Sequence, residues 1–156
     1  MDVRFNVLNE HVHKFIVVES LFSHSGEKKK LNFDINNYPK FKNKIIYLII
    51  DKEAEGIIKD KDKLNYQSVK RHNSLKRIYQ SYNYMLNGIK EASDDDLIIL
   101  SDNDEIPNLD SKKFKNSKKE LFVFKQLFFY YKFNLLYDLV PWFGSKACKK
   151  KKIKIF

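Results

Sequence analysis

Short runs of apolar residues alternate along the chain with charged or polar segments. Three runs rich in Val, Ile and Leu, at 14–20, 44–50 and 97–100, are bounded by polar residues and predict buried strands. The stretch from about 66 to 92 instead predicts a long helix, because its apolar residues share one stripe: Leu75, Ile78, Tyr82, Met85, Leu86 and Ile89. Val3, Val7 and Leu8 predict a short amphipathic helix over 2–11, and the aromatic stretch 121–133 predicts one or two strands.

The order of these elements predicts an α/β fold. Buried apolar strands separated by helices favour a sheet with parallel members, so we expect a mostly parallel central sheet flanked by helices. The 156 residues contain no internal repeat and no Pro/Gly-rich linker, which predicts a single domain over 1–156. The charged segments 52–65 and 111–119 are expected to lie on its surface.

The chain is strongly basic, with a formal net charge of +10. Such a charge favours anionic partners, namely nucleic acid, phosphorylated small molecules or an anionic membrane. The basic runs and the aromatic clusters are not interleaved, so nucleic acid is not expected, and a basic nucleic-acid or anion-binding module is kept as the alternative to an enzyme. The lysine run 149–152 is most simply a solvated face, and its other interpretation is contact with anionic lipid.

Cysteine usage and hydropathy bear on the location of the protein. Cys148 is the single cysteine, so no disulfide can form within the chain and a reducing compartment is favoured. No run of ~20 apolar residues is present, and the first residues lack the layout of a secretory signal. We expect a cytoplasmic protein, peripheral at the inner membrane face if the lysine run contacts lipid.

An acidic segment follows the third predicted strand directly. In open α/β sheets ligands bind beyond the carboxyl ends of strands, and Asp102 and Asp104 stand two residues apart at that place. Two carboxylates there can hold a hard divalent cation that bridges the phosphates of a nucleotide. The same residues with Pro107 nearby are also ordinary turn chemistry, so both interpretations stay open on the pattern alone.

Other polar residues offer further candidates, each with a plainer interpretation. Glu19, at a strand end, could hydrogen-bond a nucleotide or a sugar hydroxyl, or could be a solvated acid. Ser23, Ser25 and Gly26 could direct backbone N–H groups towards a phosphate, or could simply form a turn. His24 could be a metal ligand or a general acid/base, but a histidine in a loop is more often neither. The aromatic residues of 122–131 are expected mostly in the core, with a stacking platform for an acceptor sugar as the other interpretation.

Four blocks in order give the chain a resemblance to glycosyltransferase family 17. Leu-Ile-Ile-Leu-Ser-Asp-Asn-Asp-Glu-Ile-Pro (97–107) resembles the family's hallmark segment, and Val-Val-Glu-Ser-x-x-Ser-His-Ser-Gly (17–26) resembles a second block. Asp2-Val3-Arg4 with Leu8 is similar to the family's first helix, and the strand 44–51 ending in Asp51 also corresponds. Trp142-Phe143-Gly144 is similar as well.

The resemblance implies a GT-A type fold and a glycosyltransferase that moves a sugar, expected to be N-acetylglucosamine, from a UDP-sugar to a glycan hydroxyl. It implies a divalent metal, Mn²⁺ or Mg²⁺, with UDP-N-acetylglucosamine as donor and a glycan as acceptor. Asp102 and Asp104 would bind the metal ion that holds the donor diphosphate. Glu105 and Asp104 would be the catalytic residues, with Glu105 forming a hydrogen bond to the donor sugar or positioning the two aspartates. Residues matched for donor binding are Glu19, Ser20, Ser23, Gly26, Asn83 and Asp102.

The chain also departs from the family's pattern. The family's first strand with Phe-Asn-Glu and its C-terminal part have no counterpart here, and the long helix matches the family's polar motif only at Asn83. The expectation is therefore a partial glycosyltransferase domain over 1–156, with an inactive, truncated transferase as a further alternative.

Overall fold

The computed structural model describes residues 1–59, 66–109, 117, 119–131 and 134–153. They form two compact units, a first unit of Met1–His13 with Ala92–Lys154 and a second unit built on Lys14–Glu91. Most of the predicted surface stretch 111–119, residues 60–65 and residues 132–133 lie outside the described residues. Among the helices that are described, none has the length and apolar character needed to cross a membrane.

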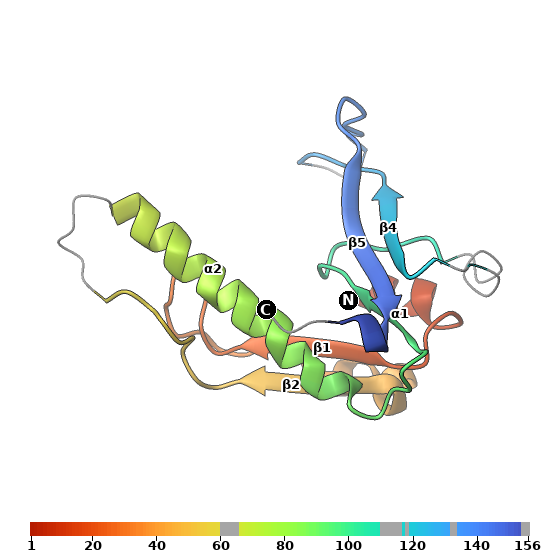
Figure 1. Ribbon diagram of the computed structural model, residues 1–156, viewed down its shortest axis with the longest axis horizontal. Coiled ribbons are helices and arrows are strands. Elements are labelled where there is room, and N and C mark those ends of the chain that lie inside the picture. The colour runs from red at the N-terminus through yellow and green to blue at the C-terminus, as the bar shows by residue number, and fades with distance from the viewer. Residues whose placement is uncertain (60–65, 110–116, 118, 132–133, 154–156) are drawn as a thin grey trace. The chain divides into compact units, whose positions relative to one another are not determined.

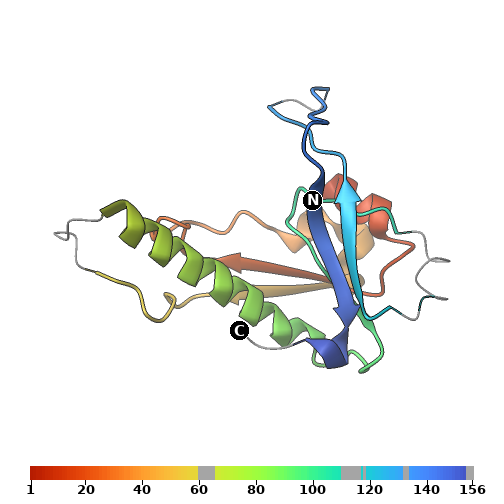
Figure 2. The same ribbon diagram turned by 45° about the horizontal axis from the view of Figure 1, so that its top comes forward.

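The second unit is built on a pair of parallel strands. β1 (Phe15–Ser20) and β2 (Ile45–Ile50) pair in register from Phe15 with Ile45 to Ser20 with Ile50. Their β-branched residues suit a pleated surface that is covered on one side. The helix α2 (Tyr66–Met85) runs along this pair (Figures 1 and 2) and continues as the 3₁₀ turn η3 (Leu86–Ile89). The predicted strands and long helix of this part of the chain are confirmed.

The predicted stripe along α2 and η3 is confirmed in part, since Ile89 is buried and Ile78, Met85 and Leu86 are partly buried. Leu75 and Tyr82 are exposed, whereas Arg77 is the buried residue of the helix. Arg77 is buried because it pairs with the partly exposed Glu53, a partner that hydropathy does not register. At the end of the helix a Cβ on Gly88 would lie 2.7 Å from the side chain of Ile16, so glycine lets η3 approach β1 closely.

The connection between β1 and β2 carries two short 3₁₀ helices, η1 (Ile35–Asn37) and η2 (Pro39–Lys44). Asp34 caps η1 by accepting a hydrogen bond from the backbone N–H of Asn36 at 2.9 Å. Phe41 of η2 is buried and meets the ring of Phe15 edge-on at 6.4 Å. These contacts cover the end of the strand pair at which β1 begins.

The first unit holds an antiparallel sheet in the order β3–β5–β4. β3 (Leu97–Leu100) pairs with the centre strand β5 (Trp142–Lys149), which also pairs with β4 (Leu121–Gln126). The fold is therefore of mixed helix and strand content, with one parallel and one antiparallel sheet among the described residues. The expectation of a mostly parallel sheet is not confirmed. β5 was missed because its Gly, Ala and Lys residues have low strand propensity.

The helix α1 (Asp2–Leu8) belongs to this unit and confirms the predicted helix, but of the three predicted apolar residues only Leu8 is buried. Phe5 and Leu8 are buried, with 0% and 3% of their surface exposed, while Val3 and Val7 are 66% and 52% exposed. Phe5 and Leu8, spaced i and i+3, are buried in place of Val3 and Val7, because burying the larger side chains removes more apolar area from water. The partly buried Arg4 is next to Phe5 on this helix.

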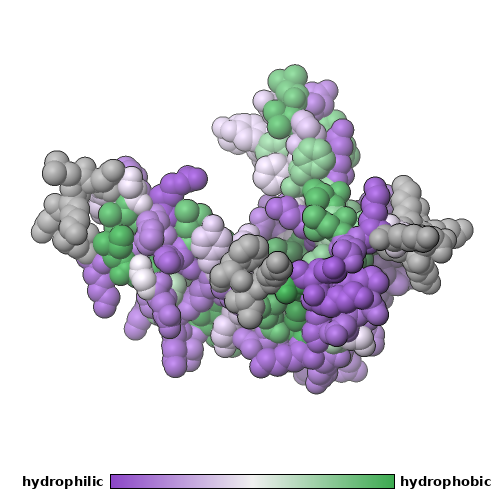
Figure 3. Space-filling model, in the orientation of Figure 1, coloured by the Kyte–Doolittle hydropathy of each residue, from purple (hydrophilic) through white to green (hydrophobic). Residues whose placement is uncertain are grey.

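The segment between β4 and β5 forms a small antiparallel hairpin. The N–H of Tyr137 donates to the carbonyl of Phe128 at 2.8 Å, and that of Tyr130 to Leu135 at 2.9 Å. Tyr131 turns the chain with a φ of 61°. In Figure 3 hydrophobic surface gathers over this segment, because most of its large apolar side chains are exposed. The expectation that these aromatic residues lie mostly in the core is wrong for this hairpin.

Candidate functional site

Asp102, Asn103, Asp104 and Glu105 form one tight turn in the first unit. The backbone N–H of Glu105 donates to the carbonyl of Asp102 at 3.1 Å, which closes a β-turn with Asp102 and Asp104 at its first and third positions. Strand β3 ends at Leu100, so the turn follows the strand after a single residue. Both aspartates are exposed. The two exposed aspartates thus belong to one short hydrogen-bonded turn.

Arg4 of α1 holds this turn by its backbone. Its Nη1 donates to the carbonyl of Asp102 at 3.0 Å and also to the carbonyl of Glu105. Burial lowers the pKa of Arg4 from its ordinary value, and the negative charges of Glu105, Asp104 and Asp102 oppose that shift. Because the guanidinium remains charged, one cation fixes both ends of the turn and balances part of its negative charge.

The side chain of Glu105 anchors the turn to β5. Its Oε1 accepts a hydrogen bond from the indole N–H of Trp142 at 2.9 Å, and its Oε2 accepts one from the hydroxyl of Ser145 at 3.2 Å. The same Oε2 accepts a bond from the backbone N–H of Asp102 at 3.3 Å. With three donors on one carboxylate, Glu105 is arranged to position the turn.

The close approach of Glu105 to β5 requires a glycine at position 144. A Cβ added to Gly144 would collide with Oε1 and Cδ of Glu105 and would lie 2.5 Å from Oε1 of Gln126. Gln126 is itself occupied, since its Oε1 accepts the backbone N–H of Ser145 at 3.0 Å. Ser145 is fully buried. A missing side chain on β5 therefore makes room for the carboxylate that braces the acidic turn.

The side chains of the turn suit a hard divalent ion that is also coordinated by a bound ligand. They do not suit an ion coordinated by protein side chains alone. The donors of the turn are two exposed carboxylates, which are oxygen ligands of the kind that Mg²⁺ and Mn²⁺ prefer. The described part of the chain contains no group of three or more His, Cys, Asp or Glu side chains arranged to hold a metal. Phosphate oxygens and water would have to complete the coordination shell. Beside the turn, the buried hydroxyl of Ser101 has no hydrogen-bond partner among the described residues.

The other predicted site residues lie in the second unit, and Glu19 is the most heavily bonded of them. Its carboxylate accepts hydrogen bonds from Lys29 at 2.6 Å, from the backbone N–H groups of Asn32 and Phe33 at 2.8 and 3.0 Å, and from the hydroxyl of Tyr47 at 2.9 Å. Burial by itself would raise the pKa of Glu19, but these bonds outweigh it and lower the pKa to about 2. The carboxylate joins the loop after β1 to both strands.

Replacing Glu19 with glutamine is expected to reduce the free energy of unfolding at neutral pH by about 2 kcal/mol. A carboxylate with a depressed pKa contributes stability above its ordinary pKa of 4.5, and that stability is lost as pH falls towards about 2. The difference between wild type and Glu19→Gln should therefore shrink between pH 5 and pH 2, which urea unfolding across this range would measure. An equal difference at both ends of the range would contradict this assignment.

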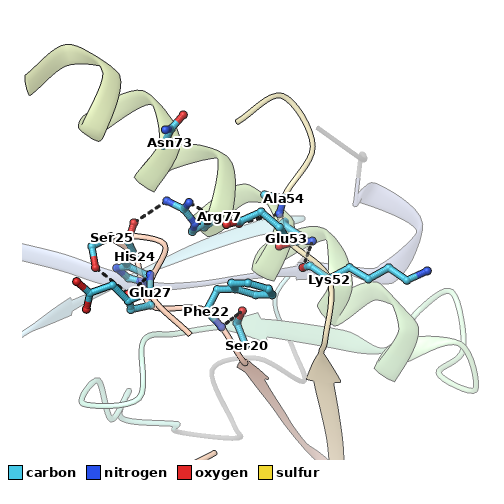
Figure 4. A network of polar contacts seen from close by, with 12 residues as sticks. Ser20, Phe22, His24, Ser25, Glu27, Lys52, Glu53, Ala54, Asn73 and Arg77 are labelled. Carbon is cyan, nitrogen blue, oxygen red and sulfur yellow. Dashed lines mark hydrogen bonds and ion pairs between the residues drawn. The ribbon is translucent and has the colours of Figure 1, made fainter. Parts of the chain in front are cut away.

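The turn after β1 is braced by Arg77 (Figure 4). Arg77 donates from Nε and Nη2 to the two carboxylate oxygens of Glu53, at 2.9 and 3.0 Å, and from Nη1 to the carbonyl of His24 at 3.0 Å. Gly26 has a φ of 93°, and a Cβ there would collide with Nη2 and lie 2.8 Å from Cζ of Arg77. Only glycine fits this position, because the backbone is left-handed and lies against the guanidinium.

The serines of this turn bond within it. The hydroxyls of Ser23 and Ser25 are 2.8 Å apart, and Ser23 Oγ accepts the backbone N–H of Glu27 at 3.1 Å. The N–H groups of Ser23 and Gly26 donate to the carbonyls of Glu27 and Ser23. The geometry is that of a self-contained turn, and three of the N–H groups available to a phosphate are used inside it.

Ser20 and Asn83 are the remaining predicted site residues, and the lysine run lies in the first unit. Ser20 accepts the N–H of Phe22 at 3.0 Å, and Asn83 lies partly buried on α2. In the first unit, Lys149 and Lys151 pair with Asp95 at 3.0 and 2.8 Å, Lys152 pairs with Glu120, and Lys150 donates to the carbonyl of Ala92 at 2.5 Å. The lysine run is thus engaged within its own unit.

Sequence reasoning missed four residues that hold these sites: Arg4, Arg77, Trp142 and Gly144. Arg4 and the segment 142–144 lie inside blocks that resemble the family, which was the available signal for them. Arg77 carried no signal, because an arginine on a helix is ordinarily a surface residue. All four act through side-chain or backbone contacts between segments far apart in the chain.

One comparison with known protein families gives a match over nearly the whole chain. The chain matches glycosyltransferase family 17 over residues 1–154. No curated protein and no solved structure matches it. The match includes the acidic turn, α1 with Arg4, and β5 with Trp142 and Gly144, so it covers every contact described for that turn. We conclude that this chain belongs to glycosyltransferase family 17.

Proposed function

We propose that the protein transfers a sugar from a UDP-sugar to a glycan hydroxyl, and that the turn 102–105 binds the donor diphosphate through a divalent ion. The donor we propose is UDP-N-acetylglucosamine, with Mn²⁺ or Mg²⁺ as the ion. Family membership supports glycosyltransferase activity in general. The observation that carries the finer proposal is the braced turn, which presents two exposed carboxylates from a backbone fixed by Arg4 and Glu105.

Each residue of the turn has a proposed task. Asp102 and Asp104 would bind the ion, which when present neutralises negative charge on the departing UDP. Glu105 serves as a positioning residue, since its carboxylate is occupied by Trp142, Ser145 and the N–H of Asp102. Arg4 keeps the two ends of the turn at a fixed spacing. Because the backbone of the turn is already fixed, less of the segment has to become ordered when the nucleotide binds.

We also propose that both units belong to one glycosyltransferase domain of the GT-A type. The family match runs through both units, and β1 and β2 supply a parallel pair of the kind that such a fold contains. Glu19, Ser20, Ser23, Gly26 and Asn83, all in the second unit, stay predicted donor-binding residues. For Glu19 and Gly26 this role is indirect, because their contacts fix the loop after β1. Contact with an anionic membrane stays a prediction.

Calorimetric titration with UDP tests the proposed donor site. We expect UDP to bind only when Mn²⁺ is present, and we expect Asp102→Asn combined with Asp104→Asn to weaken that binding at least about tenfold, because both carboxylate ligands are lost. The matched control is Asp94→Asn with Asp138→Asn, which removes the same charge at two exposed positions of the same unit. This control should keep wild-type affinity. UDP binding without metal, reduced equally by both double variants, would instead support the basic anion-binding module.

A further inference from the structure

The aromatic hairpin between β4 and β5 has a feature that the proposed donor site does not use. Trp142 is joined to the acidic turn by the bond from its indole N–H to Glu105, yet 42% of its surface is exposed. Its ring stacks on Phe128, with centroids 5.2 Å apart and planes at 18°. Tyr137 meets Phe128 edge-on at 6.0 Å. The edge of the indole is therefore fixed at the turn while part of the ring is left to solvent.

We propose that Trp142, supported by Phe128 and Tyr137, is the stacking platform for the acceptor carbohydrate. This inference rests on the proposed function, because an acceptor hydroxyl must lie close to the donor held at the turn 102–105. Sugar rings present apolar C–H faces, which pack on the electron-rich face of an aromatic ring, while their hydroxyls need polar neighbours. The hairpin supplies both, since the tyrosine side chains add hydroxyl groups to the aromatic faces.

Two observations favour a carbohydrate over a lipid surface as the occupant. The first is the direct bond between Trp142 and Glu105, which ties the aromatic group to the candidate donor site in the same unit. The second is charge: the lysines of the run 149–152 are engaged within the unit, and the hairpin segment also carries the exposed acid Asp138. At the hairpin itself, this acid opposes the attraction of the basic chain to an anionic membrane.

The chain contains one tryptophan, so its fluorescence reports Trp142 alone. Titrating the full chain with mannotriose or chitotriose, in the presence of Mn²⁺ and UDP, should quench or shift this emission in a saturable way. Vesicles of phosphatidylserine and phosphatidylcholine should leave it unchanged. A response to vesicles but not to either oligosaccharide would overturn the proposal in favour of a lipid-binding hairpin. A change in emission that depends on protein concentration and not on added oligosaccharide would overturn the proposal in favour of self-association.

Substitutions separate stacking from positioning. Trp142→Phe keeps an aromatic face and loses the N–H to Glu105, whereas Trp142→Ala loses both. If Trp142 stacks on the acceptor, calorimetry should show that the alanine variant loses about tenfold more oligosaccharide affinity than the phenylalanine variant. Leu121→Ala, at an exposed position at the start of β4, is the control and should bind as wild type.

The outcomes distinguish this inference from the proposed function. Equal losses for Trp142→Phe and Trp142→Ala would overturn the platform and leave Trp142 as a positioning residue for Glu105. Metal-dependent UDP binding with no oligosaccharide binding to the wild type would also overturn the platform while leaving the donor site intact. Absence of UDP binding to the wild type would contradict the donor site itself.

Discussion

Replacing Gly144 with alanine is expected to destabilise the first unit by about 2–4 kcal/mol and to abolish metal-dependent UDP binding. The added Cβ would collide with Glu105, whose carboxylate cannot swing away without losing its bonds to Trp142, Ser145 and the N–H of Asp102. Displacing it would leave the buried hydroxyl of Ser145 without its acceptor. The loss should be visible in urea unfolding and in calorimetry with UDP and Mn²⁺.

A double-mutant cycle tests whether the clash with Glu105 is the cause. Glu105→Ala removes the group that the new Cβ would meet, so Gly144→Ala should cost much less in that background than in the wild type. The control on the same strand is Lys146→Ala, an exposed position expected to change stability by no more than about 0.5 kcal/mol. Equal costs of Gly144→Ala in both backgrounds would show that Glu105 is not the group displaced.

Replacing Arg77 with methionine is the second change with a large expected effect, about 2–4 kcal/mol on the second unit. The variant leaves Glu53 without its bidentate partner and the carbonyl of His24 without its donor, and it removes the surface on which Gly26 packs. The cost falls below that of a fully buried pair because about a third of the Glu53 side chain is exposed and can be rehydrated. Urea unfolding would measure the loss.

Arg77→Lys is the informative companion of that variant. Lysine keeps the positive charge but cannot make two parallel bonds to a carboxylate, so it should recover only part of the lost stability. Hydrogen exchange should show the turn 22–27 losing protection in both variants, more strongly in Arg77→Met. Unchanged protection of this turn in Arg77→Met would show that the guanidinium does not brace it.

Local pattern predicted the positions of β1, β2 and β3, because β-branched and other apolar residues between polar bounds favour strands. Their burial is less complete than predicted, since most of their residues are only partly buried and β3 has no buried residue. The runs at β1, β2 and β3 consist of β-branched and other apolar residues with polar bounds, and the structure confirms all three. β5 carries no such run. It becomes a strand because β3 and β4 pair with it on both sides, and such pairing depends on tertiary context that propensity does not include.

The same distinction applies to the site. The pattern identified the acidic segment, since a strand followed by Asp-Asn-Asp can be recognised locally. The contacts that fix the segment come from Arg4 and from β5, which lie 98 and 37 or more residues away along the chain. The burial of Arg77 on α2 was missed for a related reason, because it depends on Glu53, a partner outside the helix.

The central claim, that the turn 102–105 holds a metal-bound nucleotide, can be tested by NMR on the full chain. The indole N–H of Trp142 gives the single tryptophan side-chain signal, and it donates to Glu105 at the turn. Mn²⁺ is paramagnetic and broadens signals of nearby protons, whereas Mg²⁺ does not. We predict that Mn²⁺ with UDP broadens the indole signal and the amide signals of 102–105, and that Mg²⁺ with UDP only shifts them. Broadening confined to other residues, or equal broadening in Asp102→Asn with Asp104→Asn, would contradict the account.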